Sequence, residues 1–208
     1  MKKRALTAKE VLRQKKPTFK LTGRWLDFIG EPERRGVWFI WGNSGNGKTG
    51  FAMQLCKELA KFDRVAYNSL EEGDSLTMQR TLERYGMGEL GSRFVLLRED
   101  IPTLMARLRD RKSHKIVVID SFQYTMMNYA DYIRLRDAFP RHLFIFISHA
   151  DGRHPAGRSA KQVMYDASLK VWVEGYKAVS KGRFIGSTGE LVIWDEGARM
   201  YWNNNNQR

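Results

Sequence analysis

Short apolar runs alternate with longer amphipathic stretches through the middle of the chain. The apolar runs predict β-strands at residues 37–41, 64–68, 94–97, 115–119 and 142–148. The stretches between them predict helices at residues 48–61, 75–85, 101–111 and 129–139, and in the first of these Phe51, Leu55 and Leu59 form one apolar stripe. Strands separated by helix-length segments favour right-handed crossover connections. We therefore predict a three-layer α/β/α sandwich with a mainly parallel sheet.

The pattern changes after Ala167 to short alternating runs, LKVWVEG, YKAVSKGRFIG and ELVIWDE, which are separated by glycines. Alternation of apolar and polar positions predicts strands with one solvated face, which is typical of antiparallel pairing. We expect these strands to extend the parallel sheet, so that one domain spans residues 36–202. The last residues, NNNNQR at 203–208, predict a disordered tail.

Residues 1–35 have few apolar positions and many cations. Cations among the first twenty residues include Lys2, Lys3, Arg4, Arg13, Lys15, Lys16 and Lys20. Thr7 and Glu10 have the spacing of a capping box, which predicts a short helix over residues 7–14 that Pro17 ends. We interpret this region as a basic arm with a lead-in helix. It holds a neighbouring subunit, contacts phosphates or is flexible, and the sequence does not decide among these.

Charge narrows the choice of partners. The 208 residues include 36 lysines and arginines against 23 aspartates and glutamates, which gives a formal net charge of +13. Such a surface attracts polyanions, of which nucleic acid is the commonest, although a merely solvated positive face has the same composition. The apolar runs are too short for a membrane span, and the N-terminus lacks the apolar segment of a signal peptide. The single cysteine, Cys56, fits a reducing compartment, so we expect a cytoplasmic protein without membrane contact.

The first predicted strand leads into a glycine-rich motif with the pattern G-x-x-x-x-G-K-[ST]. Its glycines let the backbone curl so that amide N–H groups point at phosphate oxygens, and the N-terminus of the next helix adds partial positive charge. We expect Lys48 to reach the β- and γ-phosphates of ATP, and the Thr49 hydroxyl to join the shell of a Mg²⁺ ion. The predicted nucleotide-binding residues are Gly42, Asn43, Ser44, Gly45, Asn46, Gly47, Lys48, Thr49 and Gly50.

Two further strand ends carry carboxylates at the same edge of the predicted sheet. Asp120 ends the strand KIVVID, where it suits a Walker B role that orders Mg²⁺ through water. Glu71 and Glu72 follow the strand RVAYNS, and either of them is a candidate base for the attacking water. A strand-capping aspartate and a solvated acidic turn are the alternatives without a catalytic role.

These motifs resemble those of the RecA-like ATPases, which include DnaB-type helicases, RecA-type recombinases and KaiC-like proteins. The resemblance covers residues 36–196: GNSGNGKT is similar to the Walker A motif, NSLEEG to the strand end with the catalytic glutamate, and VVIDSFQ to the Walker B strand. It implies a RecA-like P-loop fold, ATP and Mg²⁺ as ligands, and Glu71 rather than Glu72 as the base. FIFISHADGR resembles the next strand, whose tip senses the γ-phosphate, but this chain has Ser148 and His149 where the family usually has glutamine. We assign the sensor role to His149, with a structural histidine as the alternative.

The segment SKGRFIGSTGELVIWDE resembles the K-x-R…G-x-T-G-E hairpin of the helicase branch. In that branch the lysine and arginine enter the ATP site of the adjacent subunit and stabilise transition-state charge. Lys181 and Arg183 fall on those positions, so the resemblance implies an active site that is completed between the subunits of a ring or filament. Two basic residues on an exposed strand are the plain alternative.

In RecA-like proteins, loops after the Walker B strand and the sensor strand grip single-stranded DNA. The corresponding stretches are residues 123–131 and 151–161. Arg153, Arg158 and Lys161 in the second stretch are the predicted DNA-binding residues, because they combine positive charge with flanking glycines. Tyr124 and Tyr129 in the first stretch either stack on bases or pack against the sheet.

The sequence therefore predicts an oligomeric, Mg²⁺- and ATP-dependent ATPase that acts on single-stranded DNA in recombination, repair or replication. With no appended domain in evidence, the pattern favours a minimal recombination or annealing ATPase, of the sort that phages and mobile elements encode. Three other functions stay open: a helicase motor or accessory factor, a KaiC-like regulatory ATPase that assembles without DNA, and a small-molecule kinase. The SLE strand end and the K-x-R hairpin speak against the kinase.

Overall fold

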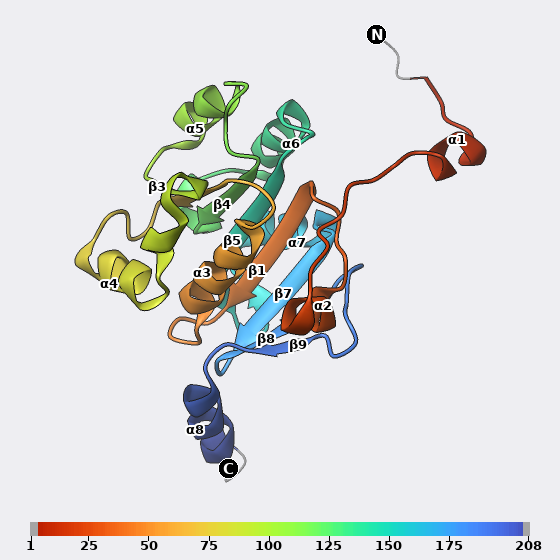
Figure 1. Ribbon diagram of the computed structural model, residues 1–208. Helices are drawn as coiled ribbons and strands as arrows, with labels where there is room; N and C mark the ends of the chain where they lie inside the picture. The colour runs from red at the N-terminus through yellow and green to blue at the C-terminus, as the bar shows by residue number, and fades with distance from the viewer. Residues whose placement is uncertain (1–3, 206–208) are drawn as a thin grey trace.

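A mainly parallel sheet forms the centre of the molecule (Figure 1). The computed structural model describes residues 4–205, so Lys2, Lys3 and residues 206–208 of the regions predicted above lie outside the described residues. In spatial order, β3-β2-β4-β5-β1-β7 run parallel, and β8 and β9 continue the sheet antiparallel. The strands are β1 (Gly36–Gly42), β2 (Val65–Ser69), β3 (Phe94–Leu97), β4 (Ile116–Asp120), β5 (Leu143–Asp151), β6 (His154–Pro155), β7 (Leu169–Glu174), β8 (Lys177–Ser180) and β9 (Glu190–Val192). The short strand β6 pairs with β5.

Helices cover both faces of the sheet. Successive side chains of each strand point to opposite faces, so each face has apolar side chains to bury. In β1, Trp38 and Ile40 belong to one apolar core, and Val37, Phe39 and Trp41 belong to the other. The first core is covered by α2 (Gly23–Ile29), α3 (Lys48–Leu59) and α4 (Leu76–Arg84), and the second by α5 (Ile101–Leu108), α6 (Tyr129–Ala138) and α7 (Arg158–Asp166). Each large side chain that is fully buried this way contributes about 1.5–3 kcal/mol. The predicted three-layer α/β/α class is confirmed.

The helices begin where capping side chains are available. Ser75 accepts a hydrogen bond from the amide of Met78 at the start of α4, and Asp100 accepts one from the amide of Thr103 at the start of α5. These contacts satisfy backbone donors that have no partner within the helix. The five predicted strands and four predicted helices occur with their ends shifted by a few residues. Within residues 4–205, no helix has the length and apolar character needed to cross a membrane.

The C-terminal part of the chain corrects the sequence prediction in two places. Strand β7 is parallel to β1, with Trp38 beside Leu169, and is not antiparallel as predicted. The reason is α7, which begins in the stretch predicted as a loop, residues 151–161, and carries the chain back across the sheet before β7 starts. Helix α8 (Asp195–Asn205) begins within the last predicted strand run, ELVIWDE, and replaces its end. The same helix continues through residues 203–205, which are therefore helical rather than disordered.

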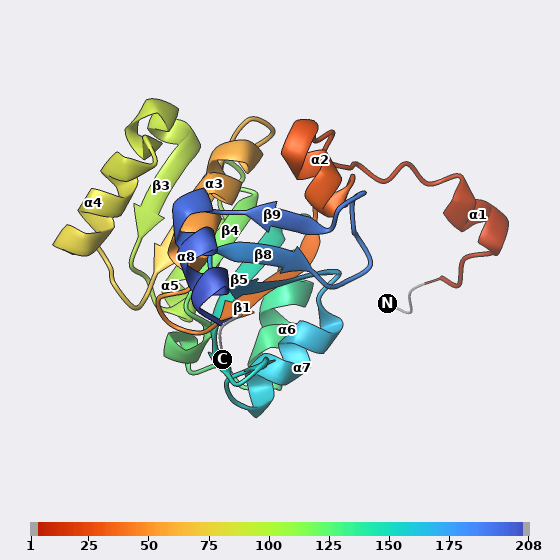
Figure 2. The same ribbon diagram turned by 90° about the horizontal axis from the view of Figure 1, so that it is seen from below.

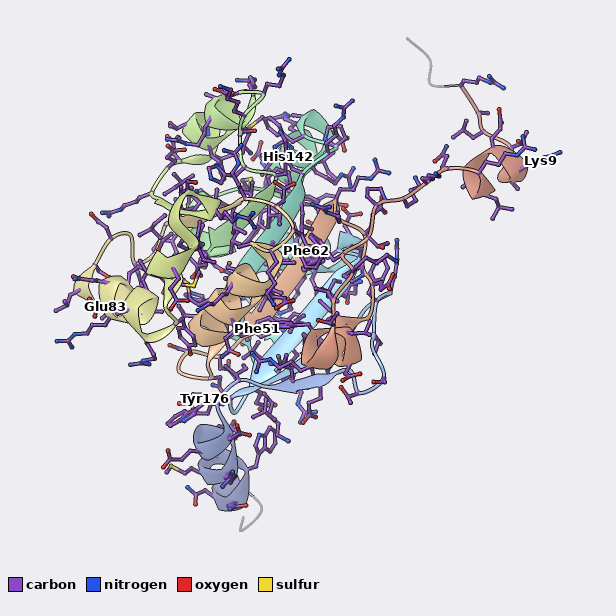
Figure 3. The ribbon with its side chains drawn as sticks, in the orientation of Figure 1. Lys9, Phe51, Phe62, Glu83, His142 and Tyr176 are labelled. Carbon is purple, nitrogen blue, oxygen red and sulfur yellow. The ribbon has the colours of Figure 1, made fainter. Side chains whose placement is uncertain are left out.

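The N-terminal region divides into a detached helix and a packed lead-in. Helix α1 (Ala8–Leu12) has the predicted capping box between Thr7 and Glu10, buries no side chain and stands away from the body (Figures 1 and 3, near Lys9). Phe19 and Trp25, in contrast, are buried in the first core. Figure 2 shows α2 beside β9, far from α1. The packed body therefore begins near residue 18, rather than at residue 36 as the sequence analysis expected.

The parallel strands give the sheet two chemically different edges. We call the edge where β1, β2, β4 and β5 end the carboxyl edge, which carries Gly42, Ser69 and Asp120. The edge where the same strands begin is the amino edge, which carries Gly36 and the residues before it. In Figure 3, Tyr176 lies at the carboxyl edge and His142 at the amino edge. Loops from separate parts of the chain meet at each edge.

Candidate nucleotide-binding site

The glycine-rich motif forms a tight loop between β1 and α3. Gly45 and Gly47 have left-handed backbone conformations, with φ of 74° and 96°, which residues with a side chain rarely adopt. A side chain at Gly42 is excluded for another reason, because its Cβ atom would lie 2.1 Å from the Val173 carbonyl oxygen of β7. Lys48 starts α3, and its Nζ donates to the Asn43 carbonyl at 2.9 Å. The structure thus has the strand, loop and helix order that a phosphate cradle requires.

Asn46 fastens the tip of this loop to the turn between β7 and β8. Its Oδ1 accepts from the Gly175 amide at 2.7 Å, and its backbone carbonyl accepts from the Tyr176 amide at 3.1 Å. Its Nδ2 donates to the Ser44 carbonyl at 3.1 Å. The side chain of Asn46 therefore orders the loop, and only its backbone is left to face phosphate.

Strands β2 and β4 lie side by side and bring the predicted carboxylates to the loop. Ser69 is paired with Asp120, and the Asp120 carbonyl accepts from the amide of Leu70. Burial raises the pKa of the Asp120 carboxyl to about 6, although the Tyr67 hydroxyl donates a hydrogen bond to it and opposes this rise. Burial also lowers the pKa of Lys48, which Asp120 partly offsets. The lysine and the aspartate thus share one desolvated cavity.

The cavity has a volume of about 440 Å³ and lies at the carboxyl edge. Its chemically active lining is Lys48, Thr49, Glu71, Glu72, Asp120 and His149. Thr49 and Asp120 offer a hydroxyl and a carboxylate oxygen, the hard donors that Mg²⁺ prefers. Among the described residues, the Thr49 hydroxyl has no protein hydrogen-bond partner, so it is available to a metal ion. The donor set fits magnesium.

Glu71 and Glu72 have different partners. Glu71 Oε2 lies 2.9 Å from His149 Nε2 across the cavity. Glu72 accepts from the Thr77 hydroxyl at 3.0 Å, which ties it to the start of α4. Glu71 is therefore the glutamate that faces His149 across the cavity, whereas Glu72 is held at the start of α4.

Ser148 and His149, at the positions of the predicted sensor, are adjacent near the end of β5 but have different surroundings. Ser148 is fully buried, and its hydroxyl accepts from Gln123 Nε2 at 2.8 Å and donates to the His149 carbonyl. His149 faces the cavity, with Nε2 3.4 Å from the Ser121 hydroxyl as well as close to Glu71. The ring of Tyr124 meets the His149 ring edge to face, with centroids 6.4 Å apart. His149 therefore joins the cavity to the segment that follows β4.

Lys181 and Arg183 are not brought to this cavity. They lie in the loop between β8 and β9 rather than on a strand. The Lys181 amide donates to the Lys170 carbonyl, and the Arg183 amide donates to the Ser168 carbonyl at 3.0 Å, next to the start of β7. This position is at the amino edge, so within one chain these two cations are remote from Lys48.

The predicted DNA-binding residues occupy two kinds of structure. Arg153 lies in the exposed turn between β5 and β6, and its carbonyl accepts from the Trp41 indole N–H at 3.1 Å. Arg158 and Lys161 lie on the first turns of α7, not on a mobile loop. Of the two tyrosines, Tyr129 stacks on Tyr132 at 5.6 Å, whereas Tyr124 is 53% exposed. Only Tyr124 is free to stack on a base.

A second cavity adjoins the phosphate loop and was missed by the sequence analysis. It has a volume of about 630 Å³ and shares Gly47, Thr49 and Gly50 with the first cavity. Its aromatic lining is Tyr85, Tyr176 and Trp194, and the Tyr176 and Trp194 rings meet edge to face at 5.0 Å. Tyr85 directly follows α4, Tyr176 lies in the β7–β8 turn, and Trp194 directly precedes α8. No local motif connects segments so far apart in the sequence.

Comparison with known proteins identifies the fold. No protein-family profile and no curated protein matches the sequence. Among solved structures, the flagellar accessory protein FlaH from Methanocaldococcus jannaschii has a TM-score of 0.59 and 13% identity, covering 84% of this chain and 90% of that chain. The KaiC-like protein PH0186 from Pyrococcus horikoshii OT3 has a TM-score of 0.59 and 14% identity, covering 86% of this chain and 98% of that chain. The chain therefore has the RecA-like P-loop fold that its motifs predict.

Proposed function

We propose that the protein is a Mg²⁺-dependent ATPase of the RecA-like type that acts on single-stranded DNA. The observation that carries the proposal is the carboxyl-edge cavity, which holds Lys48, Thr49, Glu71 and Asp120 around one phosphate loop. Backbone amides of the loop and Lys48 bind the triphosphate. Thr49 directly and Asp120 through water would hold Mg²⁺, which neutralises charge that develops on the phosphates. Glu71 would accept a proton from the attacking water.

The aromatic cavity supplies a place for the base of the nucleotide. Tyr85, Tyr176 and Trp194 present flat apolar surfaces beside the loop, and such surfaces bind planar rings by stacking and burial. The cavity begins at Gly47 and Thr49, where a triphosphate bound to the loop would leave the sugar and base. This arrangement supports a nucleoside triphosphate rather than a simple phosphate as the ligand.

We further propose that the active site is completed by a neighbouring copy of the chain. Lys181 and Arg183 are exposed and lie far from the cavity of their own chain. A trans-acting role requires this placement, because a residue committed to its own site cannot reach the next one. Such cations stabilise the transition state of phosphoryl transfer without contributing to the binding of ATP in the ground state.

The N-terminal helix offers a contact between copies. Helix α1 exposes Val11 and Leu12, Leu6 just before the helix is also exposed, and the segment around them is basic. A groove of about 500 Å³ beside β3 is lined by apolar side chains, with Glu83 and Glu89 among its lining residues. The apolar face and basic charge of the arm complement this groove, which supports assembly into a ring or filament.

DNA contacts are proposed at the carboxyl edge, close to the ATP cavity. Arg153, Arg158 and Lys161 are candidates for the phosphate backbone, and the exposed Tyr124 is a candidate for base stacking. Tyr124 contacts His149, which contacts Glu71, so two side chains would connect DNA at this surface to the proposed catalytic carboxylate. A role in recombination or annealing, as in minimal phage enzymes, is the finer form of this proposal.

The test is ATP hydrolysis with and without single-stranded DNA, together with the mass in solution in a non-hydrolysable ATP analogue. We expect stimulation by DNA and assembly in the analogue. Lys48→Ala should lower hydrolysis at least about 100-fold, because it removes a preorganised phosphate contact. Lys177→Ala, which removes a lysine of β8, is the matched control and should keep full activity. Phosphate transfer to a small acceptor would instead indicate a kinase, and assembly without a DNA effect a regulatory ATPase.

A further inference from the structure

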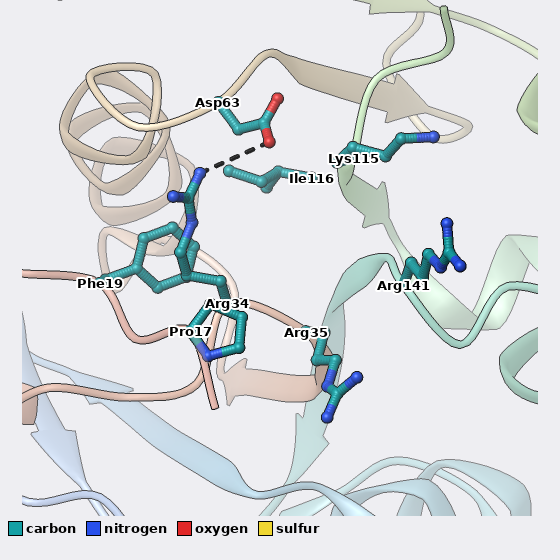
Figure 4. Close-up of a pocket in the computed structure, with 8 residues that line it drawn as sticks. All are labelled: Pro17, Phe19, Arg34, Arg35, Asp63, Lys115, Ile116 and Arg141. Atoms are coloured by element: carbon teal, nitrogen blue, oxygen red, sulfur yellow. Dashed lines mark hydrogen bonds and ion pairs between the residues drawn. The ribbon is translucent and has the colours of Figure 1, made fainter. Parts of the chain in front are cut away.

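The amino edge of the sheet carries a cluster of cations that the proposed ATPase does not use. A cavity of about 440 Å³ opens there, and its polar lining is Arg34, Arg35, Lys115, Arg141 and Asp63. The cations come from the residues just before β1, β4 and β5, which are neighbours in the sheet. Figure 4 shows Arg34, Arg35, Lys115 and Arg141 arranged around the opening. The parallel topology alone brings them together.

The charge of this cavity is not balanced by the protein. Arg34 lies 3.5 Å from the Asp63 carboxylate, and Arg35 pairs with Glu33. Lys115 donates only to the Ser113 hydroxyl, at 3.3 Å. Within residues 4–205, neither Lys115 nor Arg141 forms an ion pair. Four cations therefore face two carboxylates, and the remaining positive charge repels itself unless an anion binds.

Packing and a backbone contact hold the Arg34 guanidinium of this cavity in place. Arg34 donates to the Phe62 carbonyl at 2.7 Å and lies over the Phe19 ring, 5.5 Å from the ring centroid. Phe19 is fully buried, so it gives Arg34 a fixed support. A guanidinium held by packing and one backbone contact loses little freedom when it binds phosphate, for which its planar donors are well suited. These features are those of a phosphate-binding site.

Positive charge continues beyond this cavity. A second cavity of about 300 Å³ shares Arg35 and adds Lys16, whereas its Arg136 is already paired with Asp137 and Asp166. On the other side, the Arg64 guanidinium donates to the backbone carbonyl of Lys112, which places one more cation at the amino edge. Among the described residues, the cations of this edge without a carboxylate partner are Lys16, Arg64, Lys115 and Arg141, and a single small anion would not engage all of them. A chain of phosphates would engage them one after another.

We infer that the amino edge is a binding site for the phosphate backbone of a nucleic acid. It goes beyond the function proposed above, whose DNA contacts lie at the carboxyl edge. Strand β4 separates the two sites: Lys115 precedes its first residue and Asp120 is its last. At about 3.3 Å per residue, this strand spans roughly 17 Å. A nucleic acid at the amino edge therefore leaves the ATP cavity open.

The test compares two double variants of the full chain for binding to a fluorescent oligodeoxythymidine over a series of salt concentrations, without nucleotide. Lys115→Gln/Arg141→Gln removes the two unpaired cations of the cavity. Arg80→Gln/Lys177→Gln removes the same charge from α4 and β8, away from the amino edge. We expect the first variant to bind at least about tenfold more weakly at low salt, with the slope of log K against log salt reduced by about 1.4, since each single-strand phosphate contact contributes about 0.7. The second variant should match the wild type.

Two further measurements keep the result interpretable. Circular dichroism and the melting temperature show that the variants fold, and binding of a fluorescent ATP analogue with Mg²⁺ should be unchanged in both. Equal loss in the two double variants, or no loss in the first, overturns the inference. So does a first variant that keeps DNA binding but loses binding of inorganic phosphate or of vesicles with anionic lipids, because the site would then serve a small anion or a membrane surface.

A third variant distinguishes this inference from the proposed function. Arg153→Gln/Arg158→Gln weakens the DNA contacts proposed at the carboxyl edge. If only this variant loses DNA binding, the amino-edge site is wrong and the proposed function stands. If only the amino-edge variant loses DNA binding, the amino-edge site is supported and the DNA contacts proposed at the carboxyl edge are wrong. A wild-type protein that hydrolyses ATP and binds no nucleic acid would refute both sets of DNA contacts and leave the ATPase intact.

Discussion

The two edges of the central sheet have opposite chemistry. At the carboxyl edge, Glu71, Glu72 and Asp120 surround Lys48, which is the single cation of that cavity. At the amino edge, a cavity of similar volume has four cations and one carboxylate in its lining. The first suits a metal ion with its nucleotide, and the second suits a bare phosphate backbone. Part of the net charge of +13 is thus concentrated as excess positive charge at the amino edge.

Net charge therefore predicts the class of partner better than it predicts where on the surface that partner binds. The sequence analysis placed the contacts to DNA on the carboxyl edge, where the resemblance to RecA-like proteins puts them. The four cations at the amino edge are divided among three separate loops, with Arg34 and Arg35 adjacent in the first, so they form no long run in the sequence. Only the pairing of β1, β4 and β5 brings them together.

The largest effect we predict comes from Arg183, which lies at one edge and is proposed to act at the other. Arg183→Ala should lower hydrolysis about 1000-fold, equivalent to about 4 kcal/mol in the barrier, since a trans-acting arginine contributes chiefly to the transition state. Binding of Mg²⁺-ATP should be unchanged. Steady-state hydrolysis and equilibrium binding of a fluorescent analogue measure the two quantities.

Mixing two inactive proteins gives the decisive control for Arg183. A Glu71→Gln subunit keeps Arg183, and an Arg183→Ala subunit keeps Glu71. If the arginine acts across an interface, mixed oligomers contain some intact sites and recover part of the activity. If it acts within one chain, or only stabilises the loop, mixing recovers nothing and the trans-acting role is wrong.

The carboxyl edge is tested by the adjacent glutamates. Glu71→Gln should lower turnover about 100-fold, or about 3 kcal/mol, because it removes the proton acceptor while keeping the shape of the side chain. Glu72→Gln is the matched control and should change turnover only severalfold, since its contact is to Thr77 at the start of α4. Hydrolysis rates at saturating ATP measure both. Equal losses in the two variants would remove the distinction that the Glu71–His149 contact supports.

Much of the nucleotide-binding site was predictable, because its residues lie at the ends of strands or soon after them. Lys48 and Thr49 follow β1 within one motif, and Asp120 ends β4, so their position at the carboxyl edge follows from a parallel sheet alone. Tyr85, Tyr176 and Trp194 were not predictable, because the base cavity forms only when α4, a turn and α8 pack together.

Helix α7 was missed although its sequence carried a signal. Ala160, Val163, Met164 and Ala167 are spaced at i, i+3, i+4 and i+7 and are all buried. The flanking glycines and cations of residues 151–161 favoured a loop, and the resemblance to a DNA-binding loop reinforced that interpretation. The missed helix also reversed the predicted direction of β7, because a crossover helix is what makes a following strand parallel.

The smallest effect we predict concerns the stability of the amino edge at low pH. His142 is 5% exposed, packs against Phe139 and Phe144, and has no hydrogen-bond partner for either ring nitrogen among the described residues. Burial, with a further contribution from Lys115, lowers its pKa from 6.5 to about 4. The unfolded chain therefore binds a proton here at a higher pH than the folded chain does. The stability that neutral His142 gives is complete above pH 6.5 and is lost as the pH falls toward 4.

At pH 5 the loss from this one histidine is about 2 kcal/mol in the free energy of unfolding. His142→Phe keeps an aromatic ring in the cluster and cannot be protonated, so its stability should fall less than that of the wild type between pH 7 and pH 5. Urea unfolding at the two pH values measures the difference, and His154→Phe, which replaces an exposed histidine, should behave like the wild type. If His142→Phe shows the same pH dependence as the wild type, His142 is solvated, and the amino edge is more open to water than its packing indicates.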